Sequence, residues 1–172
     1  MRMQFKNILC ATDFSDFSNR TVNYGTALAN EFDSKLFVCH VIDLSSVAIY
    51  GEFQLDPVGL QDRIMNDANE QLQELIGGQQ IDWEPLISVG HAADEISRIV
   101  EEQDMDLVIS ATRGRSGLKR LILGSVTERL MRTLSCPLLV VPSPDKTSVA
   151  SDDQEVNMKS ILIGCDFSPD SD

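Results

Sequence analysis

The chain has 172 residues, of which 42% are hydrophobic and 24% charged, and its formal net charge is −13. This length allows one globular domain with a real core and is too short for two ordinary domains. The negative charge repels nucleic-acid phosphates, and no stretch approaches the roughly 18 apolar residues of a membrane span. The amino terminus also lacks the apolar region and cleavage site of a signal peptide, so we expect a cytoplasmic protein with no nucleic-acid or membrane partner.

Short apolar runs alternate with amphipathic segments along residues 1–142. The runs predict strands of a parallel sheet because they are almost continuously apolar. Pro85 favours an edge position for the third strand, and Ser18 is expected to cap the first helix. The predicted strands span 6–12, 35–42, 82–90, 106–112 and 136–142, and the predicted helices span 18–32, 60–76, 92–103 and 124–135.

This alternation predicts an α/β domain, with an open five-stranded parallel sheet and helices on both of its faces. In such sheets a ligand binds beyond the carboxyl ends of the strands, at the point where the strand order reverses. The segments that follow the first and the fourth strand are therefore the first places to look for a site.

Cysteine and histidine offer little for metal binding or catalysis. The chain has only two histidines, and its cysteines form no C-x-x-C pair but lie in or beside apolar runs. Buried reduced thiols are the simplest interpretation, and no metal ligand or catalytic residue is predicted. Cys39 and His40 lie within one apolar strand, where a satisfied core pair is favoured over a catalytic dyad. His91 is interpreted as a surface or capping residue.

An internal repeat follows the fifth predicted strand. Residues 143–157 are polar and contain proline, which predicts a linker. Beyond them, MKSILIGCDFSPDS (158–171) aligns without a gap to FKNILCATDFSDFS (5–18), with seven of fourteen positions identical. Chance likeness of two strand-and-turn segments is the alternative. We therefore predict a domain over 1–142, a linker over 143–157 and the truncated first strand of a second, similar domain over 158–172.

Asp13 directly follows the first predicted strand. A carboxylate at the end of a central parallel strand can accept hydrogen bonds from a ligand's hydroxyl or amino groups, or lie near a metal. A turn or capping role is the alternative. The return of this aspartate as Asp166 in the repeat favours a role in both copies.

The segment after the fourth strand, ATRGRSGLKRLILGS (111–125), gathers glycines and cations. Backbone N–H groups beside glycine and at a helix N-terminus bind anions, so Gly114, Gly124 and Ser125 could hold a di- or triphosphate. A solvated basic loop is the alternative. Neither the G-x-x-x-x-G-K-[ST] loop nor the G-x-G-x-x-G fingerprint is present. Positive charge comes from Arg113, Arg115, Lys119 and Arg120.

The glycine spacing resembles the universal stress protein (UspA) family, whose ATP-binding members carry G-x-x-G-x9-G-[ST] after the fourth strand. Gly114, Gly124 and Ser125 match this pattern, and Ala111 stands where the family has its first glycine. The resemblance spans about residues 5–142. It implies a Rossmann-like fold of the nucleotide-binding α-hydrolase type with strand order 3-2-1-4-5, and a member with two such domains in tandem.

The resemblance also implies which residues surround a nucleotide. Ala11, Thr12 and Asp13 would lie against adenosine, and Val41 would offer its backbone to the adenine. The expected cofactor is ATP, or AMP or ADP, with Mg²⁺ or Mn²⁺ held by the phosphates. The residues expected around the ribose and phosphates are Ala111, Arg113, Gly114, Arg115, Gly124, Ser125 and Val126.

The function implied is a regulatory nucleotide-binding module of the stress response. Catalysis is expected to be absent, or limited to slow ATP hydrolysis or autophosphorylation. The alternatives are a stress protein that acts through dimer or partner contacts without nucleotide, and an adenylating ligase, although ATDFSDFS (11–18) lacks the glycine-rich loop of such a ligase. Because family members pair their last strands, residues 136–142 would form a homodimer contact or bind the second domain.

Overall fold

The computed structural model describes residues 5–43, 57–112 and 124–142. The predicted linker and second-domain strand therefore lie outside the described residues. Strands and helices alternate along the described chain. They are β1 (Asn7–Ala11), α1 (Asp16–Phe32), β2 (Lys35–Ile42), α3 (Pro57–Ile76), β3 (Trp83–Val89), α4 (Ala92–Glu102), β4 (Leu107–Ala111), α5 (Ser125–Thr133) and β5 (Leu138–Val141).

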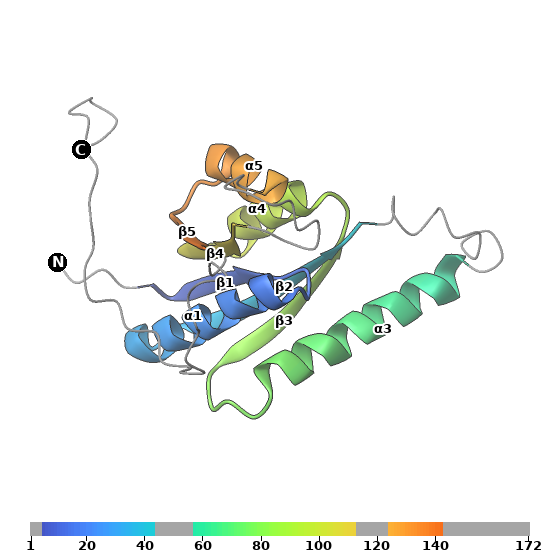
Figure 1. The fold of residues 1–172 in the computed structure, drawn as a ribbon, viewed down its shortest axis with the longest axis horizontal. Coiled ribbons are helices and arrows are strands. Elements are labelled where there is room, and N and C mark those ends of the chain that lie inside the picture. Colours follow the sequence, from blue (N-terminus) through green and yellow to red (C-terminus); the bar gives the residue numbers. More distant parts are fainter. Residues whose placement is uncertain (1–4, 44–56, 113–123, 143–172) are drawn as a thin grey trace, which may run out of the picture.

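The strands form one parallel sheet in the order β3-β2-β1-β4-β5. Helices α1 and α3 cover one face and α4 and α5 the other (Figure 1). The predicted fold class and strand order are confirmed. The chain runs outward from β1 to β3 and then returns through α4 to β4 on the other side of β1, which sets the point of reversal between β1 and β4.

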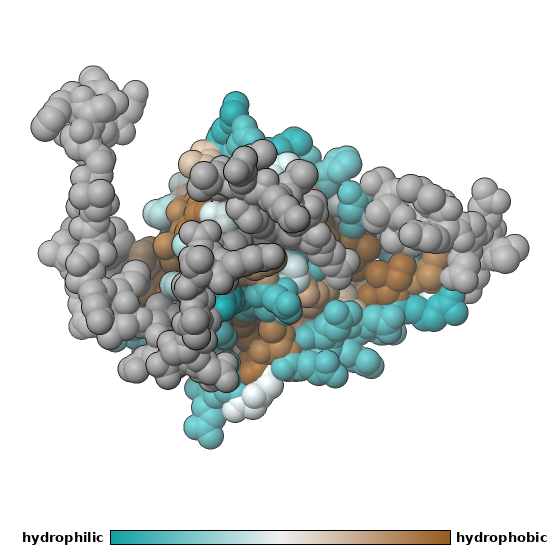
Figure 2. Space-filling view, viewed as in Figure 1, coloured by the Kyte–Doolittle hydropathy of each residue, from teal (hydrophilic) through white to brown (hydrophobic). Residues whose placement is uncertain are grey.

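The core consists of two hydrophobic clusters, one on each face of the sheet. Along β1 the side chains alternate, so that Ile8 and Cys10 join the cluster under α1 and α3, while Leu9 joins the one under α4 and α5. All three are fully buried. Full burial of an aliphatic side chain of this size stabilises a fold by about 1.5–3 kcal/mol. The outer side of α3 is hydrophilic in Figure 2, as expected of a helix that packs on one side only.

The edge strands are β3 and β5. Pro85 lies in β3, opposite Val38 of β2, and so confirms the predicted edge position of this strand. Helix α3 begins at Pro57, earlier than the predicted start, because proline fits the first turn, where its missing N–H has no partner to lose. Among the described residues, none of the helices is both long and apolar enough to span a membrane.

The cap predicted for α1 is wrong. The N-cap is Ser15, whose side chain accepts a hydrogen bond from the backbone N–H of Ser18, and the helix begins at Asp16. Phe14 has a left-handed backbone with φ 62°, which turns the chain sharply after β1 and lets the helix start earlier. Ser18 therefore lies inside the first turn, where its hydroxyl is released for another role.

Helix α1 lies unusually close to the sheet at Gly25. A Cβ atom at this position would come within 2.8 Å of Leu36 Cδ1 and closer still to Cys10 Sγ. Both neighbours are fully buried, so neither has room to move. The glycine is needed here for close approach of helix and strand.

We therefore expect Gly25→Ala to lower the free energy of unfolding by about 1–3 kcal/mol, because overpacking outweighs the gain in helix propensity. Urea titration followed by the fluorescence of Trp83, the single tryptophan, measures this change. Asn23→Ala, at an exposed position of α1, is the control and should stay within about 0.5 kcal/mol of wild type. Equal stability of the Gly25→Ala variant and wild type would contradict the close-packing argument.

Candidate functional site

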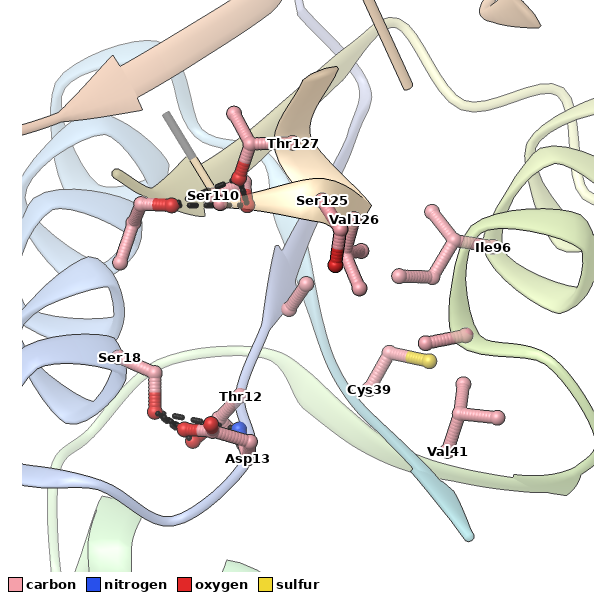
Figure 3. A pocket seen from close by; sticks show the side chains of 14 residues that line it. Thr12, Asp13, Ser18, Cys39, Val41, Ile96, Ser110, Ser125, Val126 and Thr127 are labelled. Carbon is pink, nitrogen blue, oxygen red and sulfur yellow. Dashed lines mark hydrogen bonds between the residues drawn. The ribbon is translucent and has the colours of Figure 1, made fainter. Parts of the chain in front are cut away.

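A pocket of about 260 Å³ opens at the carboxyl ends of β1 and β4, where the strand order reverses (Figure 3). Every predicted site residue that the structure describes lines it. Arg113, Gly114 and Arg115 lie outside the described residues. The lining residues are Ala11, Thr12, Asp13, Ser18, Cys39, Val41, Ala92, Ile96, Ser110, Ala111, Gly124, Ser125, Val126 and Thr127.

Asp13 lies at one side of the pocket, and its carboxylate is held by serine hydroxyls. Its Oδ1 accepts hydrogen bonds from Ser15 Oγ and Ser18 Oγ, each at 2.6 Å, and from the Ser15 backbone N–H at 3.1 Å. The backbone N–H of Asp13 donates to Ser18 Oγ at 3.1 Å. Figure 3 shows Asp13, Thr12 and Ser18 together at this side. The carboxylate thus has a defined orientation at the pocket wall.

The turn that carries Asp13 is supported from β2. The backbone N–H of Thr12 donates to the carbonyl oxygen of Cys39, and His40 Nδ1 lies 2.9 Å from the carbonyl oxygen of Thr12. Because a carbonyl oxygen only accepts, His40 Nδ1 must carry the hydrogen. The His40 ring also stacks on Phe14, with 4.3 Å between ring centroids. Of the pair predicted to lie in the core, Cys39 is buried, whereas His40 is half-buried and holds this turn.

The start of α5 forms a second side of the pocket. Gly124 is the N-cap, with φ −63°, and its backbone N–H donates to the carbonyl oxygen of Thr112 at 2.7 Å. Any residue can adopt this φ, so the backbone conformation alone does not require glycine here. The N–H groups in the first turn of a helix have no partner within the helix. Ser125 and Val126 bring such groups to the pocket, which makes this side suited to an anion.

Two buried hydroxyls fix α5 to the end of β4. Thr127 Oγ1 donates to the carbonyl oxygen of Ala111 at 2.7 Å. Ser110 Oγ lies 3.0 Å from Thr127 Oγ1, and since the threonine hydrogen is already used, the serine is the donor. Both residues line the pocket and are nearly inaccessible to solvent. The first turn of α5 is therefore held in register with the strand end.

The remaining side of the pocket is apolar. Ala92 and Ile96 of α4 line it together with Cys39 and Val41 of β2. Figure 3 shows Ile96, Cys39 and Val41 across the pocket from Asp13. Burial raises the pKa of the Cys39 thiol to about 12, so this side chain is neutral at physiological pH. An uncharged wall of this kind suits a flat or aliphatic part of a ligand.

Polar contacts with β3 hold the start of α4 in place. Glu95 Oε2 accepts hydrogen bonds from Ser88 Oγ at 2.5 Å and from Arg98 Nη2 at 2.8 Å. The hydrogen bond from Ser88, followed by that from Arg98, lowers the pKa of Glu95. The carboxylate therefore stays ionised at neutral pH and ties α4 to β3. This contact holds the apolar wall against the sheet.

Sequence reasoning missed several lining residues. Ser18 carried a signal, since it recurs as Ser171 in the repeat. Ala92 and Ile96 lie four residues apart on one side of a helix, a spacing that indicates a shared face but not what that face covers. Among the described residues no three His, Cys, Asp or Glu side chains are grouped as metal ligands. The lining residues that were not predicted are Ser18, Cys39, Ala92, Ile96, Ser110 and Thr127.

The chain resembles known proteins over the same residues. Universal stress protein MJ0531 of Methanocaldococcus jannaschii is 31% identical over 150 residues, which are 83% of this chain and 85% of that protein. The solved structure of MJ0577 from the same organism has a TM-score of 0.73 and 26% identity, and the match covers 83% of this chain and 99% of that one.

A universal stress protein from Archaeoglobus fulgidus, solved in complex with dAMP, has a TM-score of 0.58 and 19% identity, with 80% of this chain and 98% of that chain covered. At this identity the likeness concerns the fold alone. The model of the universal stress protein family matches residues 4–142. With the sheet order and helix arrangement described above, this match shows that the chain belongs to the universal stress protein family.

Proposed function

We propose that this chain is a regulatory module of the stress response that binds ATP, or AMP or ADP, in the pocket between β1 and β4. One observation carries the proposal: a carboxylate, an apolar wall and the start of a helix meet in a single pocket at the point where the strand order reverses. Members of this family bind nucleotides, as the dAMP complex of the Archaeoglobus fulgidus protein illustrates.

Each side of the pocket suits one part of a nucleotide. The apolar side, with Ile96 and Val41, would pack against the adenine. Asp13 would accept hydrogen bonds from hydroxyl groups of the nucleoside. The first-turn N–H groups of α5, at Ser125 and Val126, would bind the phosphates. A Mg²⁺ or Mn²⁺ ion would be held by those phosphates and not by a cluster of protein ligands.

Binding without rapid turnover is the form of this function that we favour. Asp13 is the one carboxylate among the lining residues that the structure describes, and its Oδ1 is occupied by serine donors. The Cys39 thiol is neutral and cannot act as a nucleophile in this state. A weak ATPase activity is the second candidate, and it would use water positioned by the bound metal.

We also propose that β5 forms a homodimer contact. Within the described residues, this strand pairs with β4 on one side and with no strand on the other. The carbonyl oxygens of Pro137 and Val141 accept hydrogen bonds from the backbone N–H groups of Val108 in β4 and of Thr112 directly after it. Because successive residues of a strand alternate, the N–H of Val140 points away from β4. A row of unpaired backbone N–H and C=O groups can pair with a strand from a second copy of the chain.

We propose a cytoplasmic location for the assembly.

The second, similar domain from residue 158 remains a proposal that rests on the internal repeat, in which residues 158–171 align to residues 5–18. The proteins compared above give it no support. One universal stress protein domain accounts for their match, which covers 99% of the MJ0577 chain.

Isothermal titration tests the nucleotide proposal. We expect ATP with Mg²⁺ to bind wild type, and Asp13→Ala and Gly124→Val each to weaken the affinity about tenfold or more, through loss of an acceptor and obstruction of the phosphate side. Met131→Ala, on the exposed side of α5, is the control and should bind as wild type. The proposal would fail if wild type bound no ATP at millimolar concentration and released no nucleotide on denaturation.

Thr127→Val tests whether the anchoring of α5 matters for binding. Loss of the hydrogen bond to Ala111 should weaken ATP affinity about fivefold and lower the free energy of unfolding by about 1–2 kcal/mol. The control is Thr133→Val, at the exposed end of the same helix, where the hydroxyl lies 2.8 Å from Ser97 Oγ of α4 and 3.2 Å from the Arg129 carbonyl oxygen, away from the pocket. Equal affinity of the Thr127→Val and Thr133→Val variants would show that the anchor is not required.

Sedimentation velocity tests the homodimer. Wild type should sediment as a dimer, whereas Val140→Pro should sediment as a monomer, because proline removes the outward N–H without removing a bond to β4. Val140→Thr keeps this N–H and should remain dimeric. A monomeric wild type, or a dimeric Val140→Pro variant, would rule out pairing through β5.

A further inference from the structure

We propose that Ser18 is a positioning residue of the pocket: with Ser15, it fixes the orientation in which the Asp13 carboxylate meets the hydroxyl groups of a nucleoside. The identity of the ligand as a nucleoside rests on the proposed function. The orientation of Asp13 does not, since it is a property of the protein without ligand.

The contacts of Ser18 reach both ends of Asp13. Its hydroxyl donates to Asp13 Oδ1 at 2.6 Å and accepts from the Asp13 backbone N–H at 3.1 Å. A bond to the side chain and a bond to the backbone of the same residue together restrict its side-chain rotation. Ser18 is only 4% exposed, so its hydroxyl makes its hydrogen bonds to protein groups.

The Ser18 hydroxyl has several acceptors within reach, and the Asp13 carboxylate is the nearest, with Oδ1 at 2.6 Å against 3.1 Å for the Ser15 carbonyl oxygen. Thr12 Oγ1 lies 3.0 Å from Ser18 Oγ, but its own hydrogen goes to Asn19 Oδ1 at 2.9 Å. Thr12 Oγ1 also accepts from the backbone N–H of Phe14 at 3.0 Å. A serine hydroxyl has one hydrogen, and the carboxylate is the strongest acceptor within reach. The short distance and the charge of the acceptor therefore favour Asp13 as the partner of this hydrogen.

Ser15 and Ser18 contribute in different ways. Ser15 caps α1 as well as donating to Asp13, so its removal would weaken the helix and the carboxylate contact together. Ser18 has no capping role. Its substitution therefore separates the orientation of Asp13 from the formation of the helix.

The internal repeat provides an independent observation. Asp13, Phe14, Ser15 and Ser18 are all identical in the second copy, where they are Asp166, Phe167, Ser168 and Ser171. The two positions between Ser15 and Ser18 differ between the copies. In the described domain the repeated serines are the two donors to the aspartate, and the repeated phenylalanine is the left-handed residue of the turn. The aspartate and both serines that donate to it are therefore among the seven positions that stay the same.

The experiment compares Ser18→Ala with Ser34→Ala. Ser34 is also a buried serine, 5% exposed, but its hydroxyl donates to the Phe5 carbonyl near the amino ends of the strands, far from the pocket. The side-chain rotation of Asp13 is measured by NMR, from three-bond couplings about χ1 in the protein without ligand. ATP affinity is measured by calorimetry for wild type, both single variants, Asp13→Ala and the Asp13→Ala/Ser18→Ala double variant.

We expect one Asp13 rotamer in wild type and Ser34→Ala, and averaged couplings in Ser18→Ala. Ser18→Ala should weaken ATP binding about tenfold, whereas Ser34→Ala should leave it unchanged. If Ser18 acts through Asp13, the double variant should bind no more weakly than Asp13→Ala alone. Should Ser18→Ala fail to fold, Ser18→Cys keeps the shape of the side chain in a slightly larger group with a much weaker donor, and the same results are expected.

Unchanged three-bond couplings of Asp13 in the Ser18 variants would overturn the proposal, whether or not the protein binds nucleotide. Averaged couplings with unchanged ATP affinity, or additive losses in the double variant, would overturn it as well. If wild type binds no ATP, the proposed function fails, and the couplings alone decide whether Ser18 orients Asp13.

Discussion

The structure depends on the burial of β1 at the centre of the sheet. Ile8, Leu9 and Cys10 are fully inaccessible to solvent, and they pack alternately into the two hydrophobic clusters. Helices cover both faces of such a strand, so its ligand-accessible part is its carboxyl end. Because β1 and β4 are parallel neighbours, their carboxyl ends lie at the same edge of the sheet. The position of the pocket therefore follows from the packing of β1, and the absence of a side chain at Gly25 is part of that packing.

Threonine hydroxyls lie beside the last carbonyl oxygens of the two central strands, β1 and β4. The ladder between β1 and β4 stops at Cys10 and Ile109. Beyond it, Thr127 Oγ1 donates to the carbonyl oxygen of Ala111 at 2.7 Å. Thr21 Oγ1 lies 3.3 Å from the carbonyl oxygen of Ala11 and donates more closely, at 2.6 Å, to that of Ser18. Each threonine belongs to the helix that follows its strand. A buried carbonyl needs a partner, and at Ala111 the helix supplies it where the neighbouring strand no longer does.

The pocket combines an apolar wall with polar groups that other residues hold in place. Asp13 is oriented by serines, the start of α5 by Thr127, and the start of α4 by the contact of Glu95 with Ser88. Such a site loses little conformational entropy when a ligand binds, because its groups are already ordered. The formal charge of −13 makes this local arrangement important, since an anion is attracted by nearby N–H groups and not by the protein as a whole.

The sequence by itself determined the alternation of strands and helices, the edge position of β3 at Pro85, and the segments that carry Asp13 and Gly124. These features are local: apolar periodicity, proline and glycine act within a few residues of the chain. Tertiary structure alone decided that Ser15 and not Ser18 caps α1, that Ser110 meets Thr127, and that Ile96 faces Cys39. The last two contacts join residues far apart in the chain, and the cap depends on the sharp turn at Phe14. Sheet register and helix position determine such contacts, and no short stretch of sequence encodes them.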